Sequence, residues 1–297
     1  MENNNTQKEW SRRVLLIIGI WIGTSIISEA RGQKLESTLL WKVEGDSIVT
    51  SYIFGTFHLL PQADFEMKEK VEQAFDASEQ IVMELDMDNP AMQSELMQNA
   101  FMKDGQTLDK LLSEEDYQTL DVYMKETTGI GLVQVNRFKP FFVSAMLIPS
   151  LMEGTPASYE MTFVQRAMSR EKEIFGLETA TEQAGMFDNI PYETQAEELM
   201  KVVTEKKEMA DLFEQMIKTY KKENIDRMYE LILENMSDKN QEKFLLIDRN
   251  INWLPKIATF SMQKSTFYAV GAGHLGGDFG MIRLLKEAGY KVTPILN

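Results

Sequence analysis

The chain has 297 residues, of which 43% are hydrophobic, 10% aromatic and 26% charged. These fractions are typical of a globular protein and exclude a disordered, collagen-like or multi-span membrane protein. Because 46 acidic residues outnumber 31 basic ones, the formal charge is −15, and a surface this acidic repels phosphate backbones, so we expect no nucleic-acid partner. The absence of cysteine from the sequence excludes disulfides, thiolate metal sites and thiol nucleophiles.

The first 30 residues have the order of a targeting segment. Polar residues with Lys8, Arg12 and Arg13 precede an apolar run over 14–27, which is followed by Ser-Glu-Ala at 28–30. This order predicts a secretory signal peptide over 1–30, since the run is shorter than the roughly 20 residues of a membrane span. An uncleaved anchor is the alternative. We therefore expect an extracytoplasmic protein, secreted or periplasmic, with 31–297 as a single catalytic domain. Contact with a membrane is expected only through a retained N-terminal segment.

Strand and helix patterns alternate along the rest of the chain. Strands are expected at 38–43 and 48–55 with a hairpin between them, then a helix from Asp64, its N-cap, to Ala77, and a strand at 81–85. The later expected elements are a helical region over about 92–168 broken by glycines and prolines, a strand at 174–177, a helical region over 192–262, a strand at 266–270, a helix at 281–288 and a strand at 291–295. Together they predict an α/β fold in which a mixed central sheet, built from N- and C-terminal strands, carries large helical insertions.

Both histidines of the chain follow a predicted strand within the same pattern, Gly-x-x-His. His58 ends the segment 55–58 (GTFH), and His274 ends the segment 271–274 (GAGH). Glycine at a strand end lets the backbone turn and pass close to a bound atom, and open α/β sheets bind ligands at the carboxyl edge of their strands. We therefore expect the two imidazoles to face each other at one site. The alternative is a pair of hydrogen-bonded core histidines.

Three charged residues stand out beside the histidines. Glu84 lies inside an apolar strand pattern, Glu178 ends the pattern at 174–177, and Arg249 interrupts an apolar helical stretch. Each also has a purely structural interpretation: a carboxylate on a solvated strand face, an acid at a helix N-terminus, and a surface residue of an amphipathic helix. Asp278, four residues after His274, is a candidate cap for the last helix.

The combination of two histidines with carboxylates suits a divalent first-row metal that keeps open positions. Such an ion lowers the pKa of bound water and polarises a carbonyl, and a neighbouring carboxylate takes the proton. The sequence has no Gly-x-Ser-x-Gly elbow. The pattern therefore favours metal-assisted hydrolysis over catalysis by a serine nucleophile.

Four segments together resemble the TraB/GumN family, which includes the Tiki-type metalloproteases. They are 54–58, 81–86, 176–183, and 248–250 followed by 270–275. The resemblance covers about residues 37–296. It implies a fold like that of the erythromycin-esterase and ChaN-like proteins, with two related halves that each present a Gly-x-x-His. It also implies a metal-dependent hydrolase; the Tiki-type members suggest manganese or cobalt, with zinc as a further option.

The resemblance also assigns roles to the candidate residues. It implies that His58 and His274 are metal ligands, that Glu84 is a ligand or general base, and that Glu178 and Arg249 are supporting site residues. In our own hypothesis, Arg249 holds the oxyanion. The expected substrate is a peptide or a small ester or amide, with a peptidase as the first choice. The alternative is a non-catalytic protein of the same fold that holds haem or a peptide in the same cleft, as ChaN-like and pheromone-shutdown relatives suggest.

Overall fold

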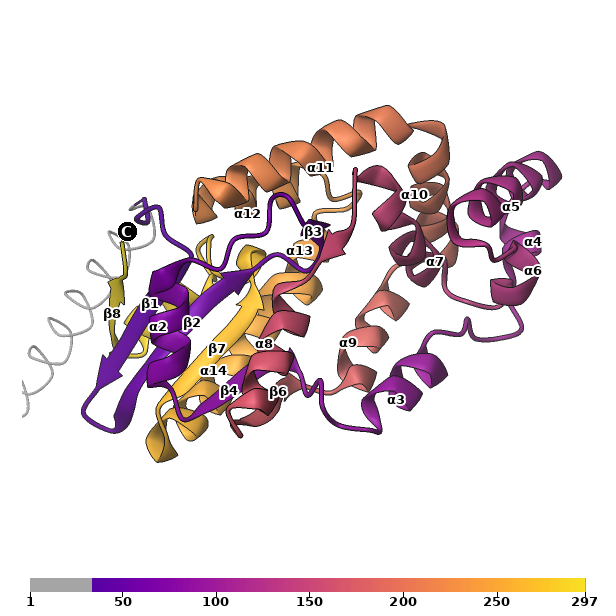
Figure 1. Cartoon of the computed structure of the whole chain (residues 1–297). Helices are drawn as coiled ribbons and strands as arrows, with labels where there is room; N and C mark the ends of the chain where they lie inside the picture. The colour runs from indigo at the N-terminus through magenta and orange to yellow at the C-terminus, as the bar shows by residue number, and fades with distance from the viewer. Residues whose placement is uncertain (1–33, 297) are drawn as a thin grey trace, which may run out of the picture.

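The computed structural model describes residues 34–296 and is built around a six-stranded mixed sheet in the order β6-β4-β7-β2-β1-β8 (Figure 1). Its strands are β1 (Leu40–Gly45), β2 (Ile48–Thr56), β4 (Gln80–Leu85), β6 (Glu173–Glu178), β7 (Thr266–Gly271) and β8 (Lys291–Pro294). The four strands from β6 to β2 are parallel, whereas β1 pairs antiparallel with both β2 and β8. The predicted fold class, a mixed sheet built from N- and C-terminal strands, is confirmed.

Helices cover both faces of this sheet. Side chains alternate between the two faces along a strand, and β7 illustrates this. Phe267 packs against Phe75 and Phe163 on one face, while the Tyr268 hydroxyl donates to the Ile257 carbonyl on the other. The helices on the first face are α2 (Glu69–Ala77) and α8 (Tyr159–Ser169), and α14 (Asp248–Gln263) lies on the second (Figure 1). The last helix, α15 (Met281–Glu287), packs against α14 and β8.

To the right of the sheet in Figure 1 lie α3 (Met92–Asn99), α4 (Leu108–Leu111), α5 (Glu114–Thr128), α6 (Leu132–Val135), α7 (Pro140–Leu147), α9 (Ala180–Met186) and α10 (Tyr192–Thr204). The other helices are η1 (Ile148–Leu151), η2 (Phe187–Asn189), α11 (Lys206–Lys221), α12 (Ile225–Glu234), α13 (Asn240–Glu242), the short π-helix η3 (Lys243–Ile247) and η4 (Ala272–His274). A second, two-stranded sheet pairs β3 (Leu60–Pro61) antiparallel with β5 (Pro156–Ala157), and β5 immediately precedes α8 in the chain.

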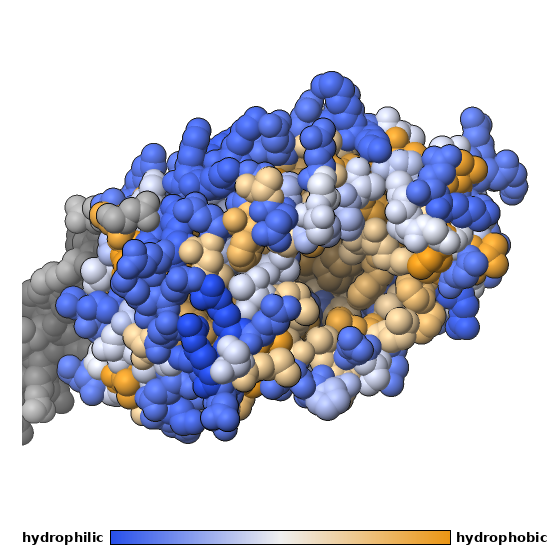
Figure 2. Space-filling model, viewed as in Figure 1, coloured by the Kyte–Doolittle hydropathy of each residue, from blue (hydrophilic) through white to orange (hydrophobic). Residues whose placement is uncertain are grey.

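The helices α4 to α7 and α10, called the helical insertion below, have an apolar core of their own, separate from the core around the sheet. Leu120, Met124, Val143 and Leu199 are among its buried members, and they come from α5, α7 and α10. Figure 2 shows a hollow between this insertion and the body that carries the sheet, and its walls are coloured as apolar. The parallel strands β2 and β7 point toward this side of the molecule (Figure 1).

Two boundaries predicted from the sequence are wrong. The helix expected to begin at Asp64 begins at Glu69, because the Asp64 backbone N–H closes a turn on Pro61 and its carboxylate pairs with Lys221 at 2.7 Å. Asp278 does not cap α15, whose N-cap is Gly280 without a side-chain bond. The predicted signal peptide, 1–30, lies outside the described residues. Among residues 34–296, we find no helix with the length and apolar character of a membrane span.

Candidate active site

The two Gly-x-x-His segments leave the sheet at adjacent positions of one edge. The strands β2 and β7 are parallel neighbours, and Gly55 lies opposite Val270 while Thr56 lies opposite Gly271. On the other side of β7 lies β4, in which Met83 pairs with Ala269. This register brings the next residue of β4, Glu84, to the same edge as both segments.

The first glycine of each segment is closely packed and has no unusual backbone angle. A Cβ at Gly271, where φ is −53°, would lie 3.2 Å from both Glu84 Oε1 and His58 Nε2. The Gly271 N–H itself donates to Glu84 Oε1 at 2.7 Å. A Cβ at Gly55 would lie 2.8 Å from the Leu275 side chain. The absence of a side chain at Gly271 therefore leaves a small space that the carboxylate and the first imidazole share.

The second histidine is buried and held in one tautomer. Asn250 Nδ2 donates to the carbonyl oxygens of His274 and Phe279, at 3.2 and 2.8 Å, which turns its Oδ1 toward the ring at 2.8 Å from Nδ1. An amide oxygen only accepts, so Nδ1 carries the proton and Nε2 presents a lone pair. This nitrogen lies 2.9 Å from Arg249 Nη1 and 3.8 Å from Glu84 Oε1. Burial and the charge of Arg249 lower the pKa of His274 to about 3.

The first histidine lies at the rim of the site, with 66% of its side chain exposed. Its Nδ1 lies 2.8 Å from Oε1 of Glu160, a residue in the first turn of α8. Loss of hydration alone would lower the pKa of His58, but the hydrogen bond to Glu160 and the charge of Glu160 raise this pKa to about 9. Its Nε2 faces the space beside Gly271.

A buried guanidinium joins the acidic residues. Arg249 donates from Nε and Nη2 to the two oxygens of Glu178, at 3.1 and 2.6 Å, and from Nη2 to Glu84 Oε2 at 2.5 Å. Gln183 donates to both carboxylates, and the Trp253 indole donates to Glu178. Burial alone would raise the pKa of Glu84, but Arg249 lowers it below its ordinary value, whereas burial dominates at Glu178 and raises its pKa.

These contacts settle the structural alternatives for the three charged residues. The side chains of Arg249, Glu84 and Glu178 are only 12%, 11% and 7% exposed, so neither a solvated strand face nor a surface helix position describes them. The helix after Glu178 is capped by Thr179. The interpretation of Glu178 as a helix N-terminal acid is therefore unnecessary, and its partner is Arg249. Sequence analysis did not find Glu160, and it included Gln183 and Asn250 only within the segments 176–183 and 248–250, without giving either a role.

The donor set has the chemistry of a divalent-metal site. Two imidazoles and a carboxylate suit a first-row ion, and each ring has the Nδ1–H bond to an oxygen that is typical of metal-binding histidines. Among residues 34–296, however, no group of three or more His, Asp or Glu side chains is arranged to hold an ion. His274 Nε2 is engaged by Arg249, so this histidine joins such a set only when Arg249 Nη1 gives up that bond.

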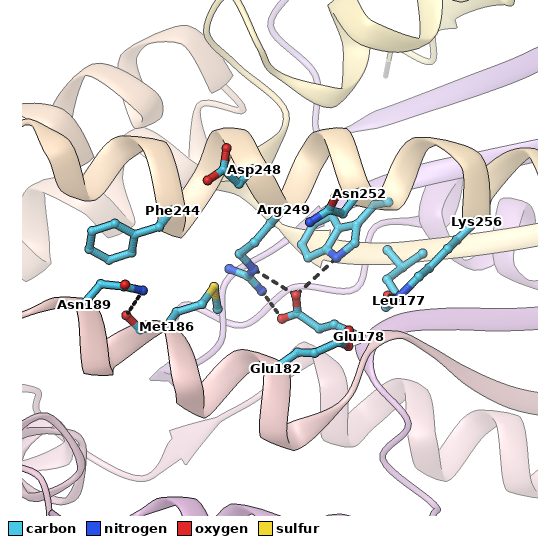
Figure 3. A pocket seen from close by; sticks show the side chains of 11 residues that line it. Leu177, Glu178, Glu182, Met186, Asn189, Phe244, Asp248, Arg249, Asn252 and Lys256 are labelled. Carbon is cyan, nitrogen blue, oxygen red and sulfur yellow. Dashed lines mark hydrogen bonds and ion pairs between the residues drawn. The ribbon is translucent and has the colours of Figure 1, made fainter. Parts of the chain in front are cut away.

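A pocket of about 260 Å³ lies beside the network, between α9 and α14 (Figure 3). It is lined by Leu177, Glu178, Glu182, Met186, Asn189, Phe244, Asp248, Arg249, Asn252, Trp253 and Lys256. Its charged members have partners within the protein: Lys256 donates to the Leu177 carbonyl, Asp248 pairs with Lys243, and Glu182 accepts from Thr179. The pocket therefore combines charged side chains that have partners with the apolar surface of Met186, Phe244 and Trp253.

Comparison with protein families gives a match to the TraB/PrgY/gumN family over residues 39–294. This match confirms the resemblance inferred from the four sequence segments. Searches of curated proteins and of solved structures found no match.

Proposed function

Because the chain belongs to the TraB/PrgY/gumN family, we propose that it is a metal-dependent hydrolase of peptides or of small esters and amides. One observation carries the proposal. An oxygen acceptor holds Nδ1 of each histidine. His274 Nε2 lies 3.8 Å from Glu84 Oε1, and His58 Nε2 and Glu84 Oε1 border the same space beside Gly271. Two histidines that serve only as hydrogen-bonded core residues would not require both rings to be oriented toward a shared buried carboxylate, whereas metal-binding histidines are oriented in this way.

The proposal assigns a role to each group. His58, His274 and Glu84 would hold a divalent ion such as manganese, cobalt or zinc. When bound, such an ion lowers the pKa of water and polarises a carbonyl. Glu178 orients Arg249 through two hydrogen bonds. Arg249 supplies a fixed positive charge that suits a developing oxyanion.

The substrate class rests on the space around the site. The pocket between α9 and α14 shares Arg249 and Glu178 with the charged network and adds Met186, Phe244 and Trp253. The hollow in Figure 2, between the helical insertion and the body that carries the sheet, has apolar walls as well. We propose that a neutral, apolar side chain of a peptide occupies the pocket. We also propose a secreted or envelope location, from the basic, apolar and small residues in order over 1–30.

The test compares cleavage of a peptide library by chelator-stripped protein, with and without added manganese, cobalt or zinc. The expected result is metal-dependent cleavage that Glu84→Gln lowers at least about 100-fold. Glu173→Gln is the matched control, because this exposed glutamate pairs with Lys264 at the start of β6, at the opposite end of that strand from Glu178. Absence of cleavage with every metal would refute the proposal. If haem addition then produced a Soret band, the binding-protein alternative would replace it.

A further inference from the structure

The carboxylate of Glu160 has all of its polar contacts at the start of α8 or in the first Gly-x-x-His segment. Its Oε1 accepts from Thr56 Oγ1 at 2.6 Å and lies 2.8 Å from His58 Nδ1. Its Oε2 accepts from Ser158, the N-cap of α8, at 2.9 Å. Only 15% of the Glu160 side chain is exposed, against 66% of His58. An enclosed carboxylate therefore holds an imidazole that is otherwise largely in solvent.

This arrangement fixes which nitrogen of His58 keeps its proton. An ionised carboxylate has no proton to donate, so Nδ1 keeps its hydrogen and Nε2 is the nitrogen that releases or takes up the second proton. The hydrogen bond at one ring nitrogen sets the state of the other. The Thr56 hydroxyl, from the second position of the Gly-x-x-His segment, holds the carboxylate in place. An exposed ring without this anchor could rotate and exchange tautomers.

We propose that Glu160 is a positioning residue, which fixes the tautomer and direction of His58 so that Nε2 faces Glu84 and the space beside Gly271. The importance of Glu160 for catalysis rests on the proposed function, whereas its effect on the His58 imidazole does not. A purely structural role, in which Glu160 only supports the start of α8, predicts lower stability without any change in the imidazole.

The chain offers a direct measurement because it contains two histidines. Nitrogen-15 NMR of histidine-labelled, metal-free protein gives one set of ring signals each for His58 and His274. Spectra are recorded above the His58 pKa of about 9, where the ring is neutral. We expect the Nδ1–H tautomer of His58 in the parent and a mixture or the Nε2–H form in Glu160→Ala. The His274 signals should stay unchanged, since Asn250 holds that ring.

Two further variants complete the test. Glu160→Gln should keep the Nδ1–H form, because Thr56 continues to donate to the amide oxygen and Ser158 can accept from the amide nitrogen. Glu72→Ala is the matched control: it removes an ion pair between α2 and Arg166 of α8 and should leave His58 unchanged. Manganese affinity, measured by EPR, should fall about 10- to 100-fold in Glu160→Ala and less than about threefold in Glu72→Ala.

The outcomes separate this inference from the proposed function. A folded Glu160→Ala protein that keeps the parental His58 tautomer overturns the inference, whether or not the protein hydrolyses anything. If Glu160→Ala does not fold, Glu160→Met decides, because methionine keeps the side-chain length without an oxygen acceptor: loss of the Nδ1–H form supports the positioning role, and its retention refutes it. A parent that binds no manganese counts against the proposed function and leaves the ring measurement valid.

Discussion

Replacing Arg249 by methionine removes a cation that the two buried carboxylates, Glu84 and Glu178, share. The guanidinium lies 2.5 Å from Glu84 and 2.6 Å from Glu178, and methionine keeps most of the side-chain length without the charge. The variant leaves two enclosed carboxylates, 11% and 7% exposed, without their counter-ion. Glu84 keeps its bond from the Gly271 N–H, which compensates only part of the lost interaction.

Removing one partner of a buried ion pair costs about 3–5 kcal/mol, because it leaves an uncompensated charge. For a protein of this size, each kcal/mol lowers Tm by about 2–4 °C, so Arg249→Met should melt about 6–20 °C below the parent. Burial raises the pKa of both carboxyl groups in the folded variant above the unfolded value. The loss in stability is therefore greatest at neutral pH and shrinks as the pH falls toward the ordinary carboxyl pKa of 4.5.

The assay is urea unfolding followed by tryptophan fluorescence between pH 5 and 8. The triple variant Arg249→Met, Glu84→Gln, Glu178→Gln is the control. It removes both carboxylate charges that Arg249→Met leaves without a counter-ion, so it should recover at least half of the lost free energy of unfolding. A loss below about 1 kcal/mol, or a loss that does not change with pH, would show that the network does not depend on Arg249 as described.

Three further predictions follow from the structure. Gly271→Ala should abolish manganese binding with little loss of fold, since its Cβ would enter the space beside Glu84 Oε1; Gly185→Ala, a helical glycine whose Cβ meets nothing within 4 Å, should leave metal titrations unchanged. Glu223→Gln should lower the free energy of unfolding by about 1–3 kcal/mol, because Lys70 and Lys68 lower the pKa of this carboxyl despite its burial. The difference in Tm from the parent should persist above pH 4.5 and vanish as the pH falls through the lowered pKa of Glu223. Leu120→Ala, in the core of the helical insertion, should lower the free energy of unfolding, measured by chemical denaturation, by about 2–5 kcal/mol. The folded variant should retain the manganese affinity of the parent. A drop in that affinity would contradict a separate core.

The sheet could be predicted because each strand carries a short-range signal. Short apolar runs bounded by polar or turn residues located β1, β2, β4, β6, β7 and β8 within a few residues, and the turn at 44–47 predicted the antiparallel hairpin. The start of α2 was missed because Asp64, a good N-cap residue, forms a turn and a distant ion pair with Lys221 instead. A tertiary contact of this kind has no signature in the local sequence.

The candidate site could be predicted only where residue type and position were both unusual. Two histidines in identical strand-end segments, and a glutamate inside an apolar strand, stand out in the sequence. The acceptors that orient the rings, Glu160 and Asn250, lie on amphipathic helices in which acidic and amide residues are common. Their roles depend on where α8 and α14 pack against the sheet edge, and nothing in their own segments predicts that.

The central claim, that the two histidines serve one metal ion, is tested most directly by titrating manganese while recording the ring protons of both histidines. Manganese is paramagnetic and broadens the signals of nuclei near it. We predict that both rings broaden together and completely at one manganese per chain, and that His274→Ala abolishes the broadening of His58. Broadening of the exposed His58 ring alone, or of neither ring at stoichiometric manganese, would contradict a shared ion.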